Sequence, residues 1–169
     1  MWVNALLSAT GTTARGVDQP WAWIEEQLGT ALPRDYKKAC EAFGVGEFSA
    51  SITLLCADET LVGDLLTLWS GLREGDADDG ALFEPYRIHE PGISGGLIPW
   101  GSSRSSDLFF WQVDGEPDSW PVIASMEDAD ELDRYDMTTT QFLYRILTDP
   151  GFRPYTVAGA WPHPYFESI

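Results

Sequence analysis

The sequence predicts a single α+β domain, with a mostly antiparallel twisted sheet flanked by N-terminal helices and one C-terminal helix. Helical patterns come first along the chain and strand patterns follow, an order typical of α+β packing and not of alternating βαβ units. A chain of 169 residues is long enough to bury one hydrophobic core. Hydrophobic residues make up 44% of it and eight residues are tryptophan, a composition that disordered chains do not have.

Two helices are expected at the start of the chain. Residues 2–8 carry a weak helical pattern. The next helix has Asp18 as its expected N-cap, Pro20 in its first turn and Gly29 at its end, because these residue types favour those positions.

A third helix is the clearest element of the sequence. It begins at Pro33, where the missing N–H costs nothing, and Gly44 and Gly46 end it. One helical face collects the residues at i, i+3, i+4 and i+7, namely Tyr36, Ala39, Cys40 and Phe43. Residues 52–55 follow as a short apolar strand, so a glycine turn delivers this helix to the edge of a sheet.

The middle of the chain is expected to change from helix to loop to strands. Leucines and a tryptophan at helical spacing predict a fourth helix over residues 61–72. Residues 74–96 are an acidic loop region in which residues 86–88 are a candidate strand. Three strands are then expected at residues 97–102, 107–113 and 120–126.

A C-terminal helix closes the predicted domain. A short acidic helix is expected first, at residues 129–135, and Thr138 or Thr139 then caps the closing helix. Residues 150–169 are an extended aromatic tail, expected to pack on the body of a single domain whose core spans residues 18–148.

Short motifs in these segments resemble the SUKH superfamily. The first block reads Trp21-x-x-x-Glu25, then Leu28-Gly29, Leu32-Pro33-x-x-Tyr36 and Phe43-Gly-x-Gly-x-Phe48, and the second reads Ile98-Pro-Trp-Gly101 followed by Asp107-Leu-Phe-Phe-Trp111. In the family a glycine often precedes that aspartate, whereas Ser106 stands there in this chain. The family includes fungal cell-wall-synthesis regulators and bacterial immunity proteins that neutralise toxins. The resemblance therefore implies a domain that binds a protein and has no catalytic role.

The charge of the chain is strongly acidic and unevenly placed. The net charge is −17, and residues 58–169, with 21 acids and six bases, carry −15 of it. Such a field repels nucleic acid and anionic membranes and attracts a basic partner, although acidity that serves only solubility is the alternative. No apolar run approaches the ~20 residues that span a bilayer, and the N-terminus has no basic export signal, so we expect a cytoplasmic protein.

Few residues in the sequence suggest catalysis or metal binding. Cys40 and Cys56 lie in apolar contexts and are expected to be buried free thiols, with a disulfide as the alternative. His89 and His163 are expected at the surface, away from any activated serine or cysteine. The acidic run at residues 76–80 does not have the glycine spacing of a calcium loop. We therefore expect no enzyme activity, no cofactor and no metal.

The strongest candidate site is a group of tryptophans and acids on the later strands. Aromatic anchors ringed by acidic residues suit a basic protein partner, here expected to be a toxin domain of the nuclease type. The partner-binding residues expected on this basis are Trp100, Asp107, Asp114, Glu116, Asp118, Trp120, Glu127, Asp128 and Asp130. Two alternatives are a carbohydrate-binding or cell-wall-regulating module that uses exposed tryptophans, and an unrecognised hydrolase that uses a pair of acids.

Overall fold

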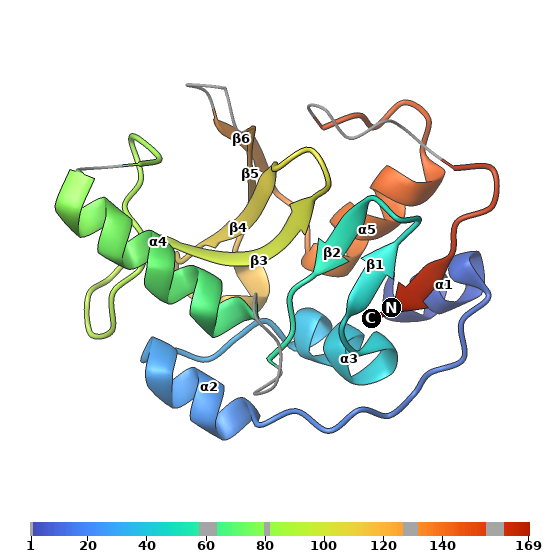
Figure 1. The fold of residues 1–169 in the computed structure, drawn as a ribbon, viewed down its shortest axis with the longest axis horizontal. Coiled ribbons are helices and arrows are strands. Elements are labelled where there is room, and N and C mark those ends of the chain that lie inside the picture. The colour runs from blue at the N-terminus through green and yellow to red at the C-terminus, as the bar shows by residue number, and fades with distance from the viewer. Residues whose placement is uncertain (1, 58–63, 80–81, 127–131, 155–160) are drawn as a thin grey trace.

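Five α-helices and a seven-stranded antiparallel sheet make up the described part of the fold (Figure 1). The structure is a computed structural model, and it describes residues 2–57, 64–79, 82–126, 132–154 and 161–169. The helices are α1 (Trp2–Thr10), α2 (Trp21–Leu28), α3 (Arg34–Phe43), α4 (Leu65–Asp79) and α5 (Thr139–Thr148). The strands are β1 (Gly46–Phe48), β2 (Ile52–Leu54), β3 (Leu97–Ser103), β4 (Leu108–Gln112), β5 (Val122–Ser125), β6 (Leu132–Tyr135) and β7 (Phe166–Ser168), and η1 (Pro117–Ser119) is a short 3₁₀ helix.

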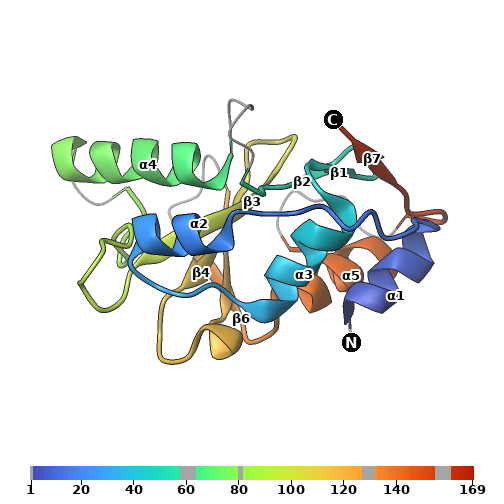
Figure 2. The ribbon, with the colours of Figure 1, turned by 90° about the horizontal axis from the view of Figure 1, so that it is seen from below.

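The sheet runs in the order β6-β5-β4-β3-β2-β1-β7, and every strand is antiparallel to its neighbours. Helices α1, α3 and α5 pack against one another, whereas α4 lies beside β3, away from that group (Figure 2). The predicted α+β fold, with N-terminal helices and a C-terminal helix, is confirmed.

The prediction of a short acidic helix at residues 129–135 is wrong for residues 132–135, the part that the structure describes. Residues 132–135 form β6, which pairs with β5 so that Leu132 lies opposite Ser125. Leu132 and Tyr135 are half-buried against the core, and pairing with the edge of β5 satisfies the backbone between them. Residues 129–131 lie outside the described residues.

Two helix starts also differ from the expectation. Pro20, and not Asp18, is the N-cap of α2, and no side chain caps that helix. Helix α4 begins at Leu65 and continues to Asp79, through residues that were expected to form a loop, while residues 61–63 lie outside the described residues. The additional turns of α4 are fixed by contacts with the loop that follows the helix, because the buried side chain of Asp76 accepts hydrogen bonds from the backbone of that loop.

The strands β1 and β7 were not predicted, and they pair across the length of the chain. Gly46 lies opposite Ser168 and Phe48 opposite Phe166. A Cβ atom at Gly46 would collide with the carbonyl oxygen of Glu167, so only glycine allows β7 to lie this close.

The core of the domain is a layer of aromatic rings between the sheet and α3 and α5. Trp100 stacks on Phe109 with ring centroids 5.4 Å apart, and the edge of Phe142 meets Trp100 at 5.8 Å. Trp111 lies 6.3 Å from Trp100, and its indole N–H donates a hydrogen bond of 2.8 Å to the hydroxyl of Thr139 at the start of α5. Such rings supply most of the buried apolar area and fix the geometry of their neighbours.

Tyr36, on α3, is fully buried and connects several parts of this core. Its ring meets Trp21 of α2 at 5.8 Å and Trp111 of β4 at 4.7 Å. Its hydroxyl donates a hydrogen bond of 2.5 Å to the carbonyl oxygen of Leu55, directly after β2. Burial, and then the nearby Cys40 thiol, raise the pKa of Tyr36, so the hydroxyl keeps its proton and remains a donor.

The two cysteines are buried free thiols, as predicted. The Cys56 thiol donates to the sulfur of Cys40 across 2.6 Å, and Cys40 also faces the carbonyl oxygen of Leu55 at 3.9 Å. Burial is the main cause that raises the pKa of the Cys40 thiol, and the contact with Cys56 adds to it. A buried, protonated thiol is a poor nucleophile.

Replacement of Tyr36 by phenylalanine leaves the ring in place and removes the hydroxyl. The carbonyl oxygen of Leu55 then loses its strongest buried donor, so we expect the free energy of unfolding to fall by about 1–3 kcal/mol, measured by urea denaturation. Tyr165→Phe is the matched control, because that side chain is exposed. A Tyr36→Phe variant as stable as the wild type would contradict the assignment.

The cysteines give a second test of the core. Because both thiols are buried, we expect neither to react with Ellman's reagent at pH 8 in the native protein, and both to react in 6 M guanidinium chloride. Absorbance at 412 nm counts the released thiolate. Rapid reaction of either cysteine with Ellman's reagent in the native protein would contradict the structure.

Candidate protein-binding surface

The two tryptophans of the predicted site lie inside the protein. Trp100 is fully buried under Phe142 of α5. Trp120 is only 4% exposed; its indole N–H donates to the carbonyl oxygen of Gly115, and its ring lies 6.3 Å from Trp111. Neither ring is presented to a partner in this structure, because both complete the aromatic layer on which the helices pack.

Asp107 also has an internal role. It is buried at the turn between β3 and β4, where it accepts a hydrogen bond of 2.7 Å from the hydroxyl of Ser103. Ser106, the residue before Asp107, adopts the left-handed backbone conformation, with φ of 64°. The turn is thus formed with serine, at the usual cost of a side chain in that conformation.

Asp114, Glu116 and Asp118 lie on the exposed loop between β4 and β5. Asp118 closes this loop onto α3. One carboxylate oxygen accepts a hydrogen bond of 2.8 Å from the backbone N–H of Arg34, and the other accepts from the guanidinium of the same residue. The backbone N–H of Arg34, followed by its guanidinium, lowers the pKa of Asp118. Asp118 is thus the cap of α3, whose N-terminus has no cap from its own chain neighbours.

The remaining expected residues, Glu127, Asp128 and Asp130, lie outside the described residues. Of the nine predicted partner-binding residues, Asp114 and Glu116 therefore lie together as exposed acids on one loop. Asp118 lies on the same loop and caps α3.

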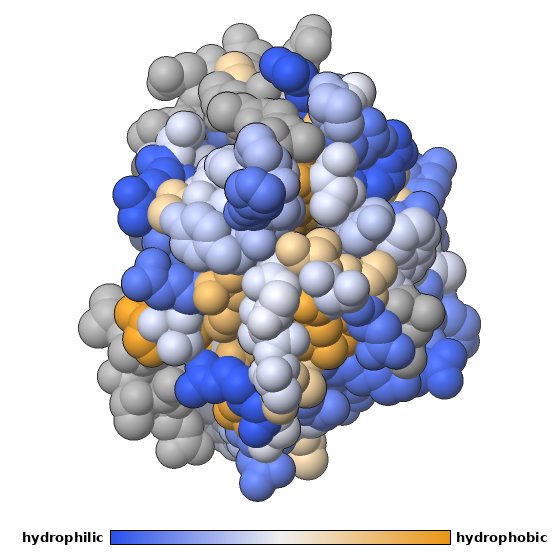
Figure 3. Space-filling view, turned by 90° about the vertical axis from the view of Figure 1, so that its right-hand side faces the viewer, coloured by the Kyte–Doolittle hydropathy of each residue, from blue (hydrophilic) through white to orange (hydrophobic). Residues whose placement is uncertain are grey.

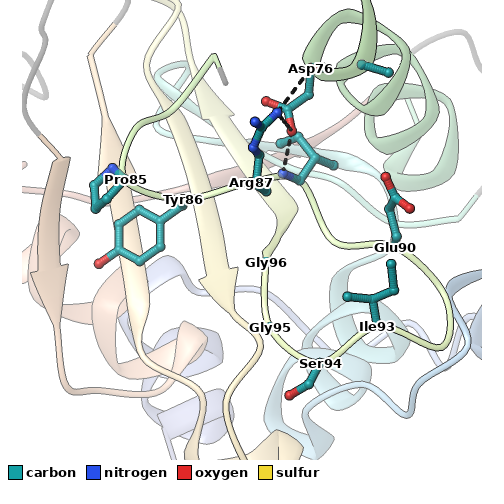
Figure 4. Close-up of a pocket in the computed structure, with 11 residues that line it drawn as sticks. Asp76, Pro85, Tyr86, Arg87, Glu90, Ile93, Ser94, Gly95 and Gly96 are labelled. Atoms are coloured by element: carbon teal, nitrogen blue, oxygen red, sulfur yellow. Dashed lines mark hydrogen bonds and ion pairs between the residues drawn. The ribbon is translucent and has the colours of Figure 1, made fainter. Parts of the chain in front are cut away.

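A second surface was not expected from the sequence, which indicated only an acidic loop. Residues 82–96 run beneath α4 and enclose a hollow of about 440 Å³ (Figure 4). It is lined by Asp76, Ala77, Pro85, Tyr86, Arg87, Ile88, Glu90, Ile93, Ser94, Gly95 and Gly96. Ile93 is 60% exposed at its rim. One feature of the sequence could have indicated this surface. It is Ile93 itself, a branched apolar residue among glycines in a predicted loop, where no core is available to bury it.

Asp76 fixes one end of this loop to α4. Its two carboxylate oxygens accept backbone hydrogen bonds from Leu82 at 2.9 Å and from Ile88 at 3.2 Å. Arg87 lies across the same carboxylate, with Nη1 3.8 Å from it (Figure 4). A buried carboxylate is stable only when it is satisfied in this way, so the loop and Asp76 hold each other in place.

His89 fixes the other end, and its expected place at the surface is wrong. The side chain is 3% exposed; Nδ1 lies 2.8 Å from the carbonyl oxygen of Gly95 and Nε2 lies 3.0 Å from that of Leu28, at the end of α2. A Cβ atom at Gly96 would lie 2.6 Å from the Cα atom of His89, which explains why glycine is needed there. Because both ring nitrogens of His89 face backbone carbonyls, the imidazole is occupied by structural contacts.

Two titratable side chains beside the hollow make structural contacts. Within the described ranges, no three histidine, cysteine, aspartate or glutamate side chains gather as metal ligands. Asp76 is engaged by two backbone amides, and the imidazole of His89 is likewise held by the loop. No helix of the described residues is long and apolar enough to cross a membrane.

Comparison with known families decides what kind of domain this is. The family model SUKH_6, described as SMI1-KNR4 cell-wall, matches residues 18–143, most of the chain. The chain belongs to this family. No curated protein and no solved structure matches it. The SUKH match runs from the segment before α2 into α5, so it includes both the Tyr36 helix and the hollow beside Ile93. At the family level the protein is therefore a domain of the toxin-immunity and SMI1-KNR4 kind.

The Asp118 cap predicts a dependence of stability on pH. Since contacts with Arg34 lower the pKa of Asp118 below its ordinary value of 3.8, its contribution is present above that pH and is lost as the pH falls through the lowered value. We expect Asp118→Ala to reduce the free energy of unfolding at pH 7 by about 1 kcal/mol, with the deficit shrinking below pH 3.8. Urea denaturation from pH 7 to pH 2.5 measures both effects.

Asp114→Ala is the matched control, because it removes an exposed carboxylate from the same loop without touching α3. An equal loss of stability in the two variants, or a deficit for Asp118→Ala that does not change with pH, would contradict the cap.

Proposed function

We propose that this SUKH domain is an immunity protein that binds a basic toxin domain, of the nuclease type, and blocks its active site with an acidic surface. The domain would inhibit the toxin by filling its active site, without catalysing a reaction. Carboxylates on its surface would take the place of the phosphates that a nuclease active site is built to bind.

The imbalance of charge is the observation that carries this proposal. The chain has 27 acids and ten bases, and six of the bases already pair with acids among the described residues. Among the residues that the structure describes, the exposed carboxylates include Asp114 and Glu116 on the β4–β5 loop. A field of this sign speeds the approach of a cationic protein and opposes that of nucleic acid.

The carbohydrate-binding alternative has little support in the arrangement of the tryptophans. Trp100, Trp111 and Trp120 are all buried, so the later strands offer no exposed indole to a sugar ring. The exposed indoles, Trp2 and Trp23, belong to α1 and α2, which lie at different ends of the molecule (Figures 1 and 2). Two such separate rings do not make one platform.

Association kinetics with candidate basic toxin domains, chosen from the genes neighbouring this one, test the proposal. We expect a tight complex that suppresses the toxin's activity, with an association rate that falls at least tenfold between 50 and 300 mM NaCl. The double variant Asp114→Asn, Glu116→Gln should slow association about three- to tenfold and leave dissociation nearly unchanged, because rim charges act mainly on encounter.

The matched control is Asp18→Asn with Glu26→Gln, which removes the same charge from exposed positions at α2. Absence of binding to every basic toxin encoded near the gene would overturn the proposal. Equal slowing by the two double variants would show that only total charge matters and would remove the β4–β5 loop from the account.

A further inference from the structure

We propose that the hollow between α4 and residues 82–96 is the docking site for that partner: Ile93 is the apolar anchor, and Glu90 pairs with a lysine or arginine of the partner. This inference rests on the proposed function and adds the place and the chemistry of contact.

Ile93 is an exposed apolar side chain beside the hollow. An isoleucine that is 60% exposed leaves most of its apolar area in water, and here it stands at the rim of a hollow of about 440 Å³ (Figure 4). Exposed apolar side chains beside a concavity, ringed by polar groups, are typical of sites where binding energy concentrates.

The loop that carries Ile93 is held in one conformation by contacts at both of its ends. Asp76 binds the backbone of Ile88, and His89 contacts the carbonyl oxygens of Gly95 and Leu28. Between these supports the backbone N–H of Ile93 donates to the carbonyl oxygen of Glu90, which closes the turn that carries both side chains. A partner that binds there does not have to order the loop, and that saving favours affinity.

The unpaired charge around the hollow is negative. Glu90 lines the hollow and Glu84 directly precedes Pro85 of its lining. Both acids are exposed, and neither forms an ion pair with another residue that the structure describes. Arg87, which also lines the hollow, is held by the carboxylate of Asp76, 3.8 Å away. The charge left for a partner is therefore negative, and it is complementary to a basic surface with an apolar residue at its centre.

The opposite side of the molecule supplies matched controls. Figure 3 shows the side on which α1 and β7 lie, where hydrophobic residues reach the surface among hydrophilic ones. Ile169, at the end of β7, is 73% exposed, and Glu167 is an exposed acid of the same strand. Ile169→Ser and Glu167→Gln therefore repeat the changes Ile93→Ser and Glu90→Gln at the far end of the sheet.

The experiment measures dissociation constants of the five proteins, wild type and four variants, for each purified basic toxin domain that is found encoded near the gene. We expect Ile93→Ser to weaken binding about 30-fold, mainly through faster dissociation, and Glu90→Gln about tenfold with a weaker dependence on salt. The two variants of β7 should bind within twofold of the wild type. Thermal unfolding should be unchanged for all four, because each side chain is exposed.

The outcomes separate this inference from the proposed function. If the wild type binds and the Ile93 and Glu90 variants bind equally well, the partner docks elsewhere and the inference is overturned while the proposed function stands. If the β7 variants lose affinity instead, the α1 and β7 side is the interface, and the inference fails. If the wild type does not bind, the proposed function fails and the inference fails with it.

Discussion

The hydrogen bond from the Tyr36 hydroxyl to the carbonyl oxygen of Leu55 is the contact on which the rest of the architecture depends. It joins α3 to the end of β2 inside an aromatic layer, where neither group can reach water. The backbone N–H of Leu55 in turn donates to the carbonyl oxygen of Trp100, so the same segment places β3. The loop that carries Ile93 is attached to the first residue of β3, since Ile88 bridges to Leu97. The position of the exposed loop thus follows from the buried core.

The molecule separates its structural and binding roles by burial. Every tryptophan of the later strands is part of the aromatic layer, and two acids that might have faced a partner, Asp107 and Asp118, hold a turn and cap a helix. Asp114 and Glu116 remain exposed on the β4–β5 loop, and Ile93 is exposed beside the hollow. We propose that the carboxylates increase the rate of association with a basic partner and that Ile93 decreases the rate of dissociation.

Much of the fold could be predicted because the decisive signals are local. The face of α3 that contains Tyr36, the run of β-formers in β4 and the Thr138 cap of α5 are all visible within ten residues of sequence. The pairing of β1 with β7 could not be predicted, because three-residue strands more than 110 residues apart carry no local pattern. The acids of the later strands and loops were expected to bind a partner because of their composition, and that expectation stays a prediction. Burial of Trp100 depends on how α5 crosses the sheet, which sequence spacing does not show.

The central claim, that a basic partner docks over the hollow beside Ile93, is tested most directly by hydrogen–deuterium exchange of the whole chain, free and bound to the basic toxin domain. The account predicts slower exchange in the complex for the backbone amides of residues 90–96, with smaller changes on the β4–β5 loop. Protection confined to α1 and β7, with exchange at residues 90–96 unchanged, would contradict it.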